Sequence, residues 1–594
     1  MDSLYNPSFI LIFGAVILTL VPKKFRSTFF LVISLIGLIL VWNLPAGSHI
    51  YIKFLNFDLI LLKVDFLSRI FATIFALITF LGGIYAFHIK DTLQQVATLF
   101  YSASAIGATF AGDFITLFIY WELMAISSVI LVWSGKKSES TNVGFRYLIV
   151  HLFGGSVLLA GIVLHILETN STTIVWLNSR SSIANWLILV GFGLNAAIPP
   201  LNAWLPDAYP RASITGAVFL SALTTKTAVY ALARVFPGWE ILLILGTIMT
   251  IYGVVYALLT NDIRELLAYH IISQVGYMVA GVGIGTQLSI NGSTAHAFSH
   301  ILYKALLFMG AGVVLYSTGT SKLNKLGGLI KFLPLTFILY LIGGFSISSV
   351  PLFNGFISKS IIVHAALENA VELFTKYPTG DIYLIGVIGV HLMNLAMIGT
   401  FLSTTLKLPY YVWFSKESPD SQLENNPVPV NMHIGMALTA IICIIFGVKP
   451  SLLYTYLPFK MDYHPFEITH LAETLEILIA TFIIFWIFKS KLKPEPVTLL
   501  DFDWFYRRPK TLIKRVLVDG VLAVFDKTDQ LVVAITRRVI GFGKNPINSI
   551  YYFNPKGKSI TNIEYDPNIS RLSTQVIISG ILLVFVITVM LVLF

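Results

Sequence analysis

The chain has 594 residues, of which 56% are hydrophobic and only 12% are charged. Together with a mean hydropathy of +0.80, this composition excludes a soluble globular protein. Apolar runs long enough to cross a hydrocarbon core of about 30 Å predict an all-α polytopic membrane protein. The formal net charge of +10 is explained mostly by loop orientation, so nucleic acid is not an expected partner.

The apolar runs predict about sixteen membrane spans, with the first run as a span rather than a cleavable signal peptide. They cover residues 9–21, 28–45, 66–88, 95–112, 113–134, 144–167, 183–201, 214–236, 239–259, 267–286, 294–317, 332–368 (interrupted), 383–406, 432–449, 470–489 and 572–594. The single cysteine, Cys443, cannot form an intrachain disulfide or hold an iron–sulfur cluster or a thiolate zinc site alone. No cofactor, metal or redox centre is therefore expected.

Basic residues are divided unevenly between alternate loops. The richer set contains Lys23, Lys24, Arg26, Lys90, Lys136, Lys137, Arg211, Arg264, Lys322, Lys325, Lys331, Lys407 and Lys416. The poorer set contains Lys53, Lys63, Arg180, Lys376 and Lys460. The positive-inside rule makes the first set cytoplasmic, which predicts that both termini lie outside the cell membrane.

Two spans carry signs of an internal break. Pro199 and Pro200 interrupt the seventh span, and Ser348, Ser349 and Pro351 interrupt the twelfth. Proline removes a backbone donor and clashes with the preceding turn, and broken helices in corresponding places indicate a transporter built from repeats. Spans four to eight and nine to thirteen are the expected halves, although no residue-level repeat is evident.

The segment from Lys489 to Arg571 is the largest change in composition. Apolar residues there follow a helical period with Lys, Arg and Asp between them, which predicts an amphipathic helix. They are Ile513, Leu517, Val521, Val524, Phe525, Val532, Ile535 and Val539. Such a helix lies along the membrane surface or against other spans. A basic tail near anionic lipid is the alternative.

Four charged residues fall inside the predicted spans. Glu122 lies in the fifth, Lys226 in the eighth, Lys304 in the eleventh, and Lys359 just beyond the break of the twelfth. Such groups normally face a protein interior or a wet cavity. Burial disfavours the charged form of either type, so they can exchange protons. A static ion pair between Glu122 and a lysine is the alternative, but buried pairs contribute little stability.

His296, His300 and Lys304 recur at every fourth residue. On a helix that spacing stacks the three side chains over roughly 12 Å. Because imidazole titrates near neutral pH, the histidines and His151 are candidate relays. A buried histidine bonded to a backbone carbonyl is the alternative for His151. A metal site on His296 and His300 lacks further ligands nearby in the sequence and is disfavoured.

Several motifs together resemble the antiporter-like membrane subunits of respiratory complex I, Mrp-type sodium/proton antiporters and membrane-bound hydrogenases. They are WELMAISS, PPLNAWLPDAYPRASITGAVFLSALTTKTAVYALAR, DIRELLAYHIISQVGYMVAG, HAFSHILYKALLFMGAG and NGFISK, within residues 66–410. The resemblance implies a fourteen-helix core of two inverted five-helix repeats, each with a broken helix and a proton half-channel. A lateral segment plus a final span looks like the large complex I subunit, whereas the body motifs and DFDWFYRR look more like the D-type subunit of Mrp antiporters.

Carried over by position, Glu122, Lys226, Lys304 and Lys359 match the family's charged residues of spans five, eight, eleven and twelve. One position departs from the pattern, because the family's lysine five residues before the proline of its PL-x-x-WLPDA motif is Asn195 here. Asparagine cannot carry a proton as an ammonium does. We therefore expect Glu122 to be served by Lys226, or the half containing Lys304 and Lys359 to dominate conduction.

The expected function is proton translocation, with sodium exchange left open, by a subunit of a multisubunit membrane complex. Protons would enter from the cytoplasm, pass among Glu122, Lys226, His296, His300 and Lys304, and leave by way of Lys359. The alternatives are a proton channel driven by an oxidoreductase, a non-transporting assembly or anchoring subunit, and a partner of an inorganic-carbon uptake protein. The expected partners are other hydrophobic subunits and membrane lipid.

The expected domains follow the spans and breaks in chain order. They are the N-terminal spans (1–94), the first repeat (95–260), the second repeat (261–410), additional spans (411–489), the cytoplasmic amphipathic segment (490–571) and the final span (572–594).

Overall fold

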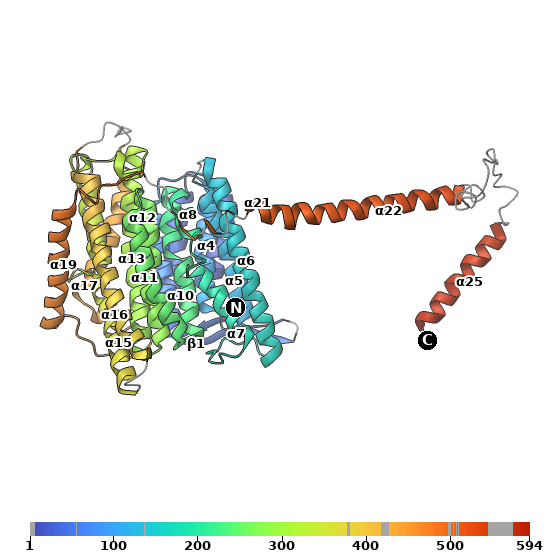
Figure 1. The fold of residues 1–594 in the computed structure, drawn as a ribbon, viewed down its shortest axis with the longest axis horizontal. Helices are drawn as coiled ribbons and strands as arrows, with labels where there is room; N and C mark the ends of the chain where they lie inside the picture. The colour runs from blue at the N-terminus through green and yellow to red at the C-terminus, as the bar shows by residue number, and fades with distance from the viewer. Residues whose placement is uncertain are drawn as a thin grey trace. The chain divides into compact units, whose positions relative to one another are not determined.

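The computed structural model describes residues 6–54, 56–135, 138–376, 381–416, 427–496, 500–502, 504, 505, 508, 510–544 and 574–593. Contacts divide the chain into two compact units, Met1–Phe502 and Asp503–Phe594. The first unit is a bundle of roughly parallel and antiparallel helices (Figure 1). The second contains a long helix and a further apolar helix. The predicted all-α architecture is confirmed, apart from one β-hairpin.

The helices of the bundle follow the predicted spans closely. Before the first repeat come α1 (Pro7–Leu20), α2 (Arg26–Asn43) and α3 (Phe66–Tyr85). The repeat regions contain α4 (Thr92–Phe110), α5 (Phe114–Trp133), α6 (Ser138–Thr169), α7 (Ile183–Asn195), α8 (Trp204–Ala208), α9 (Ile214–Ala222), α10 (Thr224–Val235), α11 (Glu240–Leu259), α12 (Ile263–Ile284), α13 (Gln287–Thr318), α14 (Pro334–Ile347), α15 (Asn354–Lys376) and α16 (Asp381–Thr400). Two π-helical stretches, η5 (Phe401–Lys407) and η6 (Tyr410–Phe414), continue α16, and α17 (Val430–Val448), α18 (Ser451–Tyr454) and α19 (Ile468–Phe488) complete the bundle.

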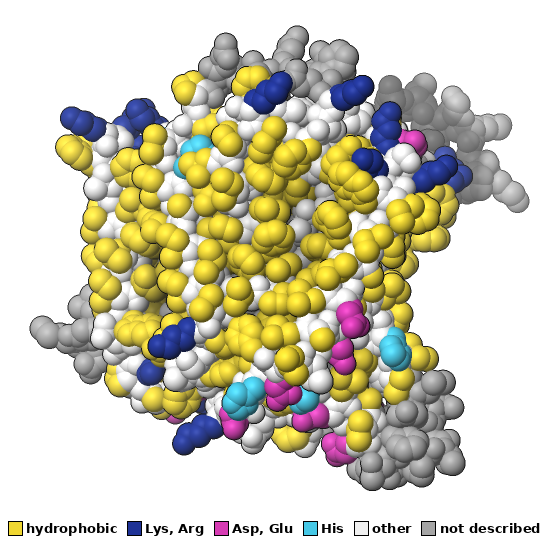
Figure 2. Space-filling model, turned by 90° about the vertical axis from the view of Figure 1, so that its left-hand side faces the viewer, with side chains coloured by type: hydrophobic (Ala, Val, Ile, Leu, Met, Phe, Trp, Pro, Cys, Tyr) yellow, Lys and Arg dark blue, Asp and Glu magenta, His cyan; other side chains and the backbone are white. Residues whose placement is uncertain are grey.

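Eleven helices in the described ranges are long and apolar enough to cross a membrane, and four more are apolar but shorter. Figure 2 shows the hydrophobic belt on one face of the bundle, with mostly Lys and Arg along its upper edge and Asp, Glu and His gathered along its lower edge. This distribution is what a bilayer requires of a helical protein. The count of sixteen spans stays a prediction, although each expected span coincides with a helix or a pair of helices.

A hairpin between α2 and α3 was not predicted. Its strands, β1 (Gly47–Phe54) and β2 (Phe57–Val64), are antiparallel, with Phe54 opposite Phe57. The alternating side chains in this short connection are typical of a strand pair. Asp113 joins the hairpin to the bundle, because its carboxylate accepts the Ile60 amide at 2.7 Å and caps α5 through the Thr116 amide at 2.8 Å.

The two halves of the core carry the same backbone joint. The amide of Phe114 donates to Thr172 O at 2.8 Å, and the amide of Ile263 donates to Ser321 O at 2.9 Å. The same number of positions separates Phe114 from Ile263 as Thr172 from Ser321, and α6 and α13 each have 32 residues. The repeats are therefore α4 to α10 and α11 to η5. An odd number of spans in each repeat inverts the second relative to the first.

The helix breaks also correspond. Ala197 and Ser349 both have positive φ angles, 59° and 58°, a conformation that non-glycine residues seldom adopt. The first break begins after Asn195, the last residue of α7, a few residues before Pro199. The second break begins after Ile347, the last residue of α14, as predicted. The predicted span 214–236 coincides with the apolar stretch Ile214–Val235, which Leu223 divides into α9 and α10.

The second unit contains α21 (Lys510–Ile513), the π-helical η7 (Lys514–Asp519), α22 (Gly520–Lys544) and α25 (Thr574–Leu593). The amphipathic helix is thus confirmed over the residues of α22, whose apolar side chains, such as Val524 and Phe525, are exposed. The part of the predicted segment from 545 to 571 lies outside the described residues.

Asp501, at the end of the first unit, is held by the tyrosines of α11 and α12. The hydroxyls of Tyr252 and Tyr269 each donate a hydrogen bond to one of its carboxylate oxygens, and the bond from Tyr269 is 2.8 Å long. The Tyr256 hydroxyl donates to Leu500 O at 2.8 Å. Hydrogen bonds to a charged group contribute about 1.5–3 kcal/mol each. The carboxylate therefore fixes the chain just before the second unit begins.

We expect Asp501→Ala to release this attachment. In the assembled protein, limited proteolysis should cut the stretch between Lys489 and Phe502 several times faster, while the rest of the bundle keeps its cleavage pattern. Asp519→Ala, an exposed substitution in η7, is the matched control. Equal cleavage of the two variants would contradict an anchoring role for Asp501.

Candidate functional site

The row of titratable side chains lies on α13, which is the longest helix of the second repeat and is almost wholly buried. Its N-terminus is capped by Thr286, which accepts the Ser289 amide, and it ends at Gly319 with φ of 68°. His296, His300 and Lys304 all have 0% exposure. The predicted stripe is therefore turned into the protein, and no member of it faces the surroundings of the bundle.

The stripe is only partly hydrogen-bonded. His296 Nδ1 lies 2.9 Å from Ser358 Oγ on α15, and its Nε2 lies 3.4 Å from the Tyr303 hydroxyl. Within the described residues, both ring nitrogens of His300 and the Nζ of Lys304 have no partner. Buried polar groups are almost always paired with protein or water. Within the described residues, the row therefore retains unused hydrogen-bonding capacity.

Lys226 follows the break between α9 and α10. Its Nζ donates to Ser221 O at 2.6 Å and to Thr225 Oγ1 at 3.0 Å. The break supplies these partners, because a carbonyl in the last turn of α9 has no intrahelical donor. The Lys226 charge acts electrostatically on His300 and Lys304 of α13.

Glu122 lies on α5 and does not form an ion pair with Lys226 among the described residues. Its Oε1 is buried without a hydrogen-bond partner and lies against Gly155 of α6. A Cβ at Gly155 would come 1.8 Å from that oxygen, so only glycine leaves room for the carboxylate. The static ion pair considered from the sequence is not formed here.

The repeat explains why Glu122 needs this glycine. The number of positions that separates Phe114 from Ile263 also separates His151 from His300 and Gly155 from Lys304. The first repeat thus has a histidine in the same place, but glycine where the second repeat has its lysine. The Glu122 carboxylate fills the space beside that glycine.

His151 and Asn195, the other residues predicted for the first half, are both buried. His151 Nδ1 lies 2.9 Å from Tyr147 O, its ring stacks on Tyr147 with centroids 4.0 Å apart, and its Nε2 is unpartnered within the described residues. This backbone contact is the alternative considered for His151. Neither polar atom of the Asn195 side chain has a partner there either, so the site that holds lysine in the family pattern is polar but uncharged.

A hydroxyl cluster beside Lys226 was missed at the sequence level. The Tyr101 hydroxyl lies 2.6 Å from Thr224 Oγ1 and accepts the Thr224 amide at 3.0 Å. Tyr147 and Tyr209 lie close to the same threonine. These tyrosines come from α4, α6 and the turn after α8. The short polar stretch SALTTKT was the sequence feature that could have indicated such a cluster.

Lys359 of α15 lies at the second break. It donates to Ile347 O, the last residue of α14, at 2.5 Å, and its Nζ is 5.2 Å from the centre of the Tyr277 ring. The side chain is 2% exposed but lines a cavity of about 270 Å³ between α15, α16, α19 and the loop before α19. That volume accommodates several water molecules, so Lys359 has access to water.

Two further buried basic residues join the second half. His270 Nε2 on α12 lies 2.6 Å from Ser403 Oγ, and Lys407 of η5 donates to Leu258 O at 2.6 Å. The charges of Lys304 and Lys359 act on His270. His270 lies in the motif DIRELLAYHIISQVGYMVAG. A titratable residue inside an expected membrane span was the sequence feature that could have identified it.

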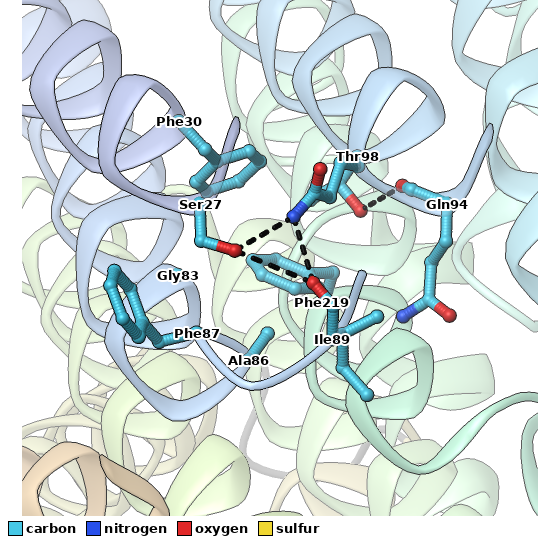
Figure 3. A pocket seen from close by; sticks show the side chains of 10 residues that line it. Ser27, Phe30, Gly83, Ala86, Phe87, Ile89, Gln94, Thr98 and Phe219 are labelled. Carbon is cyan, nitrogen blue, oxygen red and sulfur yellow. Dashed lines mark hydrogen bonds between the residues drawn. The ribbon is translucent and has the colours of Figure 1, made fainter. Parts of the chain in front are cut away.

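A second hollow, between α2, α3 and α4, lacks this chemistry (Figure 3). There the Gln95 amide donates to Ser27 Oγ at 3.2 Å and to Ile89 O at 2.9 Å, and the Thr98 hydroxyl donates to Gln94 O at 2.7 Å. Among the residues that the structure describes, no titratable side chain lines this hollow. It is therefore not part of the charged row.

Inverted five-span repeats with broken helices and a buried row of Lys, His and Glu define an antiporter-like membrane subunit. Residues 111–379 match the family model described as NADH:quinone oxidoreductase/Mrp antiporter, TM. Residues 111–379 therefore carry the membrane region shared by antiporter-like subunits of complex I and Mrp complexes.

The similar proteins include an uncharacterised archaeal protein and a sodium/proton antiporter subunit. An uncharacterised protein of Methanocaldococcus jannaschii is 29% identical over 393 residues, which are 62% of this chain and 77% of that protein. The Na(+)/H(+) antiporter subunit A1 of Staphylococcus haemolyticus is 28% identical over 438 residues, 67% of this chain. The chain spans about half the length of this relative, 53%. Since the named relatives are subunits A1, the expected likeness to the D-type Mrp subunit is not confirmed.

Solved structures show the same fold. The Mrp complex from Dietzia sp. DQ12-45-1b matches with a TM-score of 0.75 and 21% identity, covering 94% of this chain and 64% of that one. The archaeal membrane-bound sulfane sulfur reductase matches with a TM-score of 0.65 and 23% identity, covering 81% and 99%. Respiratory complex I from Thermus thermophilus gives 0.60 and 18%, covering 75% and 98%.

Proposed function

We propose that this chain translocates protons as one subunit of a multisubunit complex in the cell membrane, and that it exchanges them for sodium. The observation that carries the proposal is the unpaired row on α13. His300 and Lys304 are fully buried with no partner among the described residues, and a water-accessible Lys359 lies beyond them. A row built only for stability would be paired.

The proposed path has a well-connected half and a weaker half. In the second repeat a proton passes between His300, Lys304 and Lys359 as each ammonium changes the charge felt by the next. Lys304 is subject to the charges of both Lys226 and Lys359, so the release of one proton favours the uptake of the next. In the first repeat, Glu122 and Lys226 act without a lysine at position 195.

We further propose the predicted orientation, with both termini outside and the basic loops in the cytoplasm. The predicted domains are proposed as the working division with one change. The boundary between the repeats, predicted at 260/261, is moved to before α11, so that the first repeat is α4 to α10 and the second is α11 to η5. Lateral docking of the second unit on lipid or on neighbouring subunits belongs to the same proposal.

The test is to purify the complex with its co-eluting subunits and to reconstitute it in sealed vesicles. A sodium gradient should produce proton movement, read by a trapped pH dye and abolished by a protonophore. Co-eluting iron–sulfur or hydrogenase proteins with sodium-independent pumping would favour the second candidate, an oxidoreductase-driven subunit, which the folds of the sulfur reductase and complex I also support. A complex that moves no protons in either assay would leave only an assembly or anchoring role.

A further inference from the structure

We propose that the cavity beside Lys359 is the binding site at which a monovalent metal cation replaces the proton of that lysine. The inference rests on the proposed proton translocation and adds a second ligand and its position. It comes from the cavity lining, which combines a buried ammonium, an unpaired hydroxyl and an acidic mouth.

The Lys359 ammonium already occupies the position of a bound cation. It contacts Ile347 O at the C-terminal end of α14, where the last carbonyls of a helix lack amide donors and carry partial negative charge. Interrupted helices bind cations in membrane transporters through such carbonyls. When Lys359 gives its proton to cavity water, the positive charge that the carbonyl stabilised is lost.

Ser349 supplies a second oxygen, which accepts and donates no hydrogen bond among the described residues. It lines the same cavity, is 2% exposed, and its Oγ has no hydrogen-bond partner within the described residues. Its φ of 58° is a conformation that non-glycine residues seldom adopt. A buried hydroxyl without a partner at a helix break is a ready oxygen ligand, and hydroxyl and carbonyl oxygens suit hard cations.

The mouth of the cavity favours cations over anions. Asp462, Glu467 and Glu473 line it together with His364, His464 and His470. His364 lies 3.4 Å from Glu368 and His464 lies 3.7 Å from Asp462, so two of the three imidazoles stand beside carboxylates. His470 Nδ1 instead lies 2.9 Å from Pro465 O. Carboxylates lining a cleft raise the local cation concentration. The Tyr277 ring lies beside Lys359 on its inner side. His270, His296, His300 and Lys304 lie within electrostatic range of it.

Exchange follows from charge balance. With Lys359 protonated, its ammonium repels a second cation from the same carbonyl, because two unit charges about 4 Å apart repel by several kcal/mol at low effective dielectric. Once the Nζ proton has passed to water, one metal cation enters and total charge is unchanged. One proton therefore leaves for each cation bound.

The first measurement is equilibrium binding of radioactive sodium to the purified, assembled complex. Binding should rise with pH, and Ser349→Ala should weaken it at least fivefold, as should Glu473→Gln at the exposed mouth. Glu476→Gln, on α19 but not on the cavity lining, is the matched control. Sodium binding that is unchanged in both variants, or independent of pH, would overturn the inference.

The second measurement separates this inference from the proposed function. In vesicles, the half-saturating sodium concentration for proton movement should rise at least fivefold in the same two variants, with potassium as the competing cation. Potassium as effective as sodium would assign the site to monovalent cations generally. Proton movement that persists with unchanged sodium dependence in both variants overturns the cation site alone, whereas a wild-type complex that moves no protons overturns both proposals.

Discussion

Replacing Lys304 by alanine should abolish proton translocation, with a loss of at least tenfold in the initial rate. The charges of Lys226 and Lys359 both act on Lys304. Its Nζ has no hydrogen-bond partner in the described part of the chain, so its removal breaks no structural bond. What is lost is the only ammonium on α13 that links the two halves. The measurement is proton uptake in vesicles containing the assembled complex.

Two controls make the Lys304 result interpretable. Lys304→Met keeps most of the side-chain volume and should be as inactive as alanine, which excludes a cavity effect. Lys331→Ala, at an exposed lysine before α14, should leave the rate unchanged. Full transport by an assembled Lys304→Ala complex would remove this residue from the path and refute the central proposal.

Replacing Gly155 by alanine should lower the rate as strongly as Glu122→Gln, by about two- to tenfold. The added methyl would lie 1.8 Å from Glu122 Oε1, so the carboxylate must turn away from α6. Glu122→Gln instead keeps the shape and removes the charge. If the first repeat conducts through a carboxylate held at Gly155, displacement and neutralisation have the same effect.

The neighbouring glycine provides the control. A Cβ at Gly154 would come 3.0 Å from a methyl of Leu194, and a leucine can move by a few tenths of an ångström, so Gly154→Ala should keep the rate. Loss in Glu122→Gln with normal transport in Gly155→Ala would show that Gly155 does not position the carboxylate. Normal rates in both would place the first repeat outside the path.

Hydropathy and breakers were sufficient to predict most of the bundle, because membrane spans are defined by length and polarity. The break at Ser348 and Ser349 followed from the nearby Pro351. The break at Leu223 could not be predicted in this way, since the surrounding sequence has neither glycine nor proline. There the helix is interrupted by tertiary contacts, including the Tyr101 hydroxyl that accepts the Thr224 amide.

The site was only partly predictable for a similar reason. The four-residue spacing indicated the α13 row directly, because helical geometry alone aligns it. The cavity at Lys359 is built from α15, α16, α19 and the loop before α19, and its lining residues extend from Ser349 to Ile477 along the chain. The correspondence of Gly155 with Lys304 follows from the backbone hydrogen bonds at Phe114 and Ile263, which align the two repeats. It could not be read from the sequence, because the side chains of the two repeats differ.

That correspondence has an energetic consequence. Two halves related by inversion and carrying the same side chains would give a proton the same succession of wells and barriers from either side of the membrane. Gly155 opposite Lys304, and Glu122 turned into the vacant position, remove this equivalence at the centre of the protein. A proton on the proposed path would therefore meet a different succession of wells and barriers from the two sides, and the glycine in place of a lysine contributes to that asymmetry.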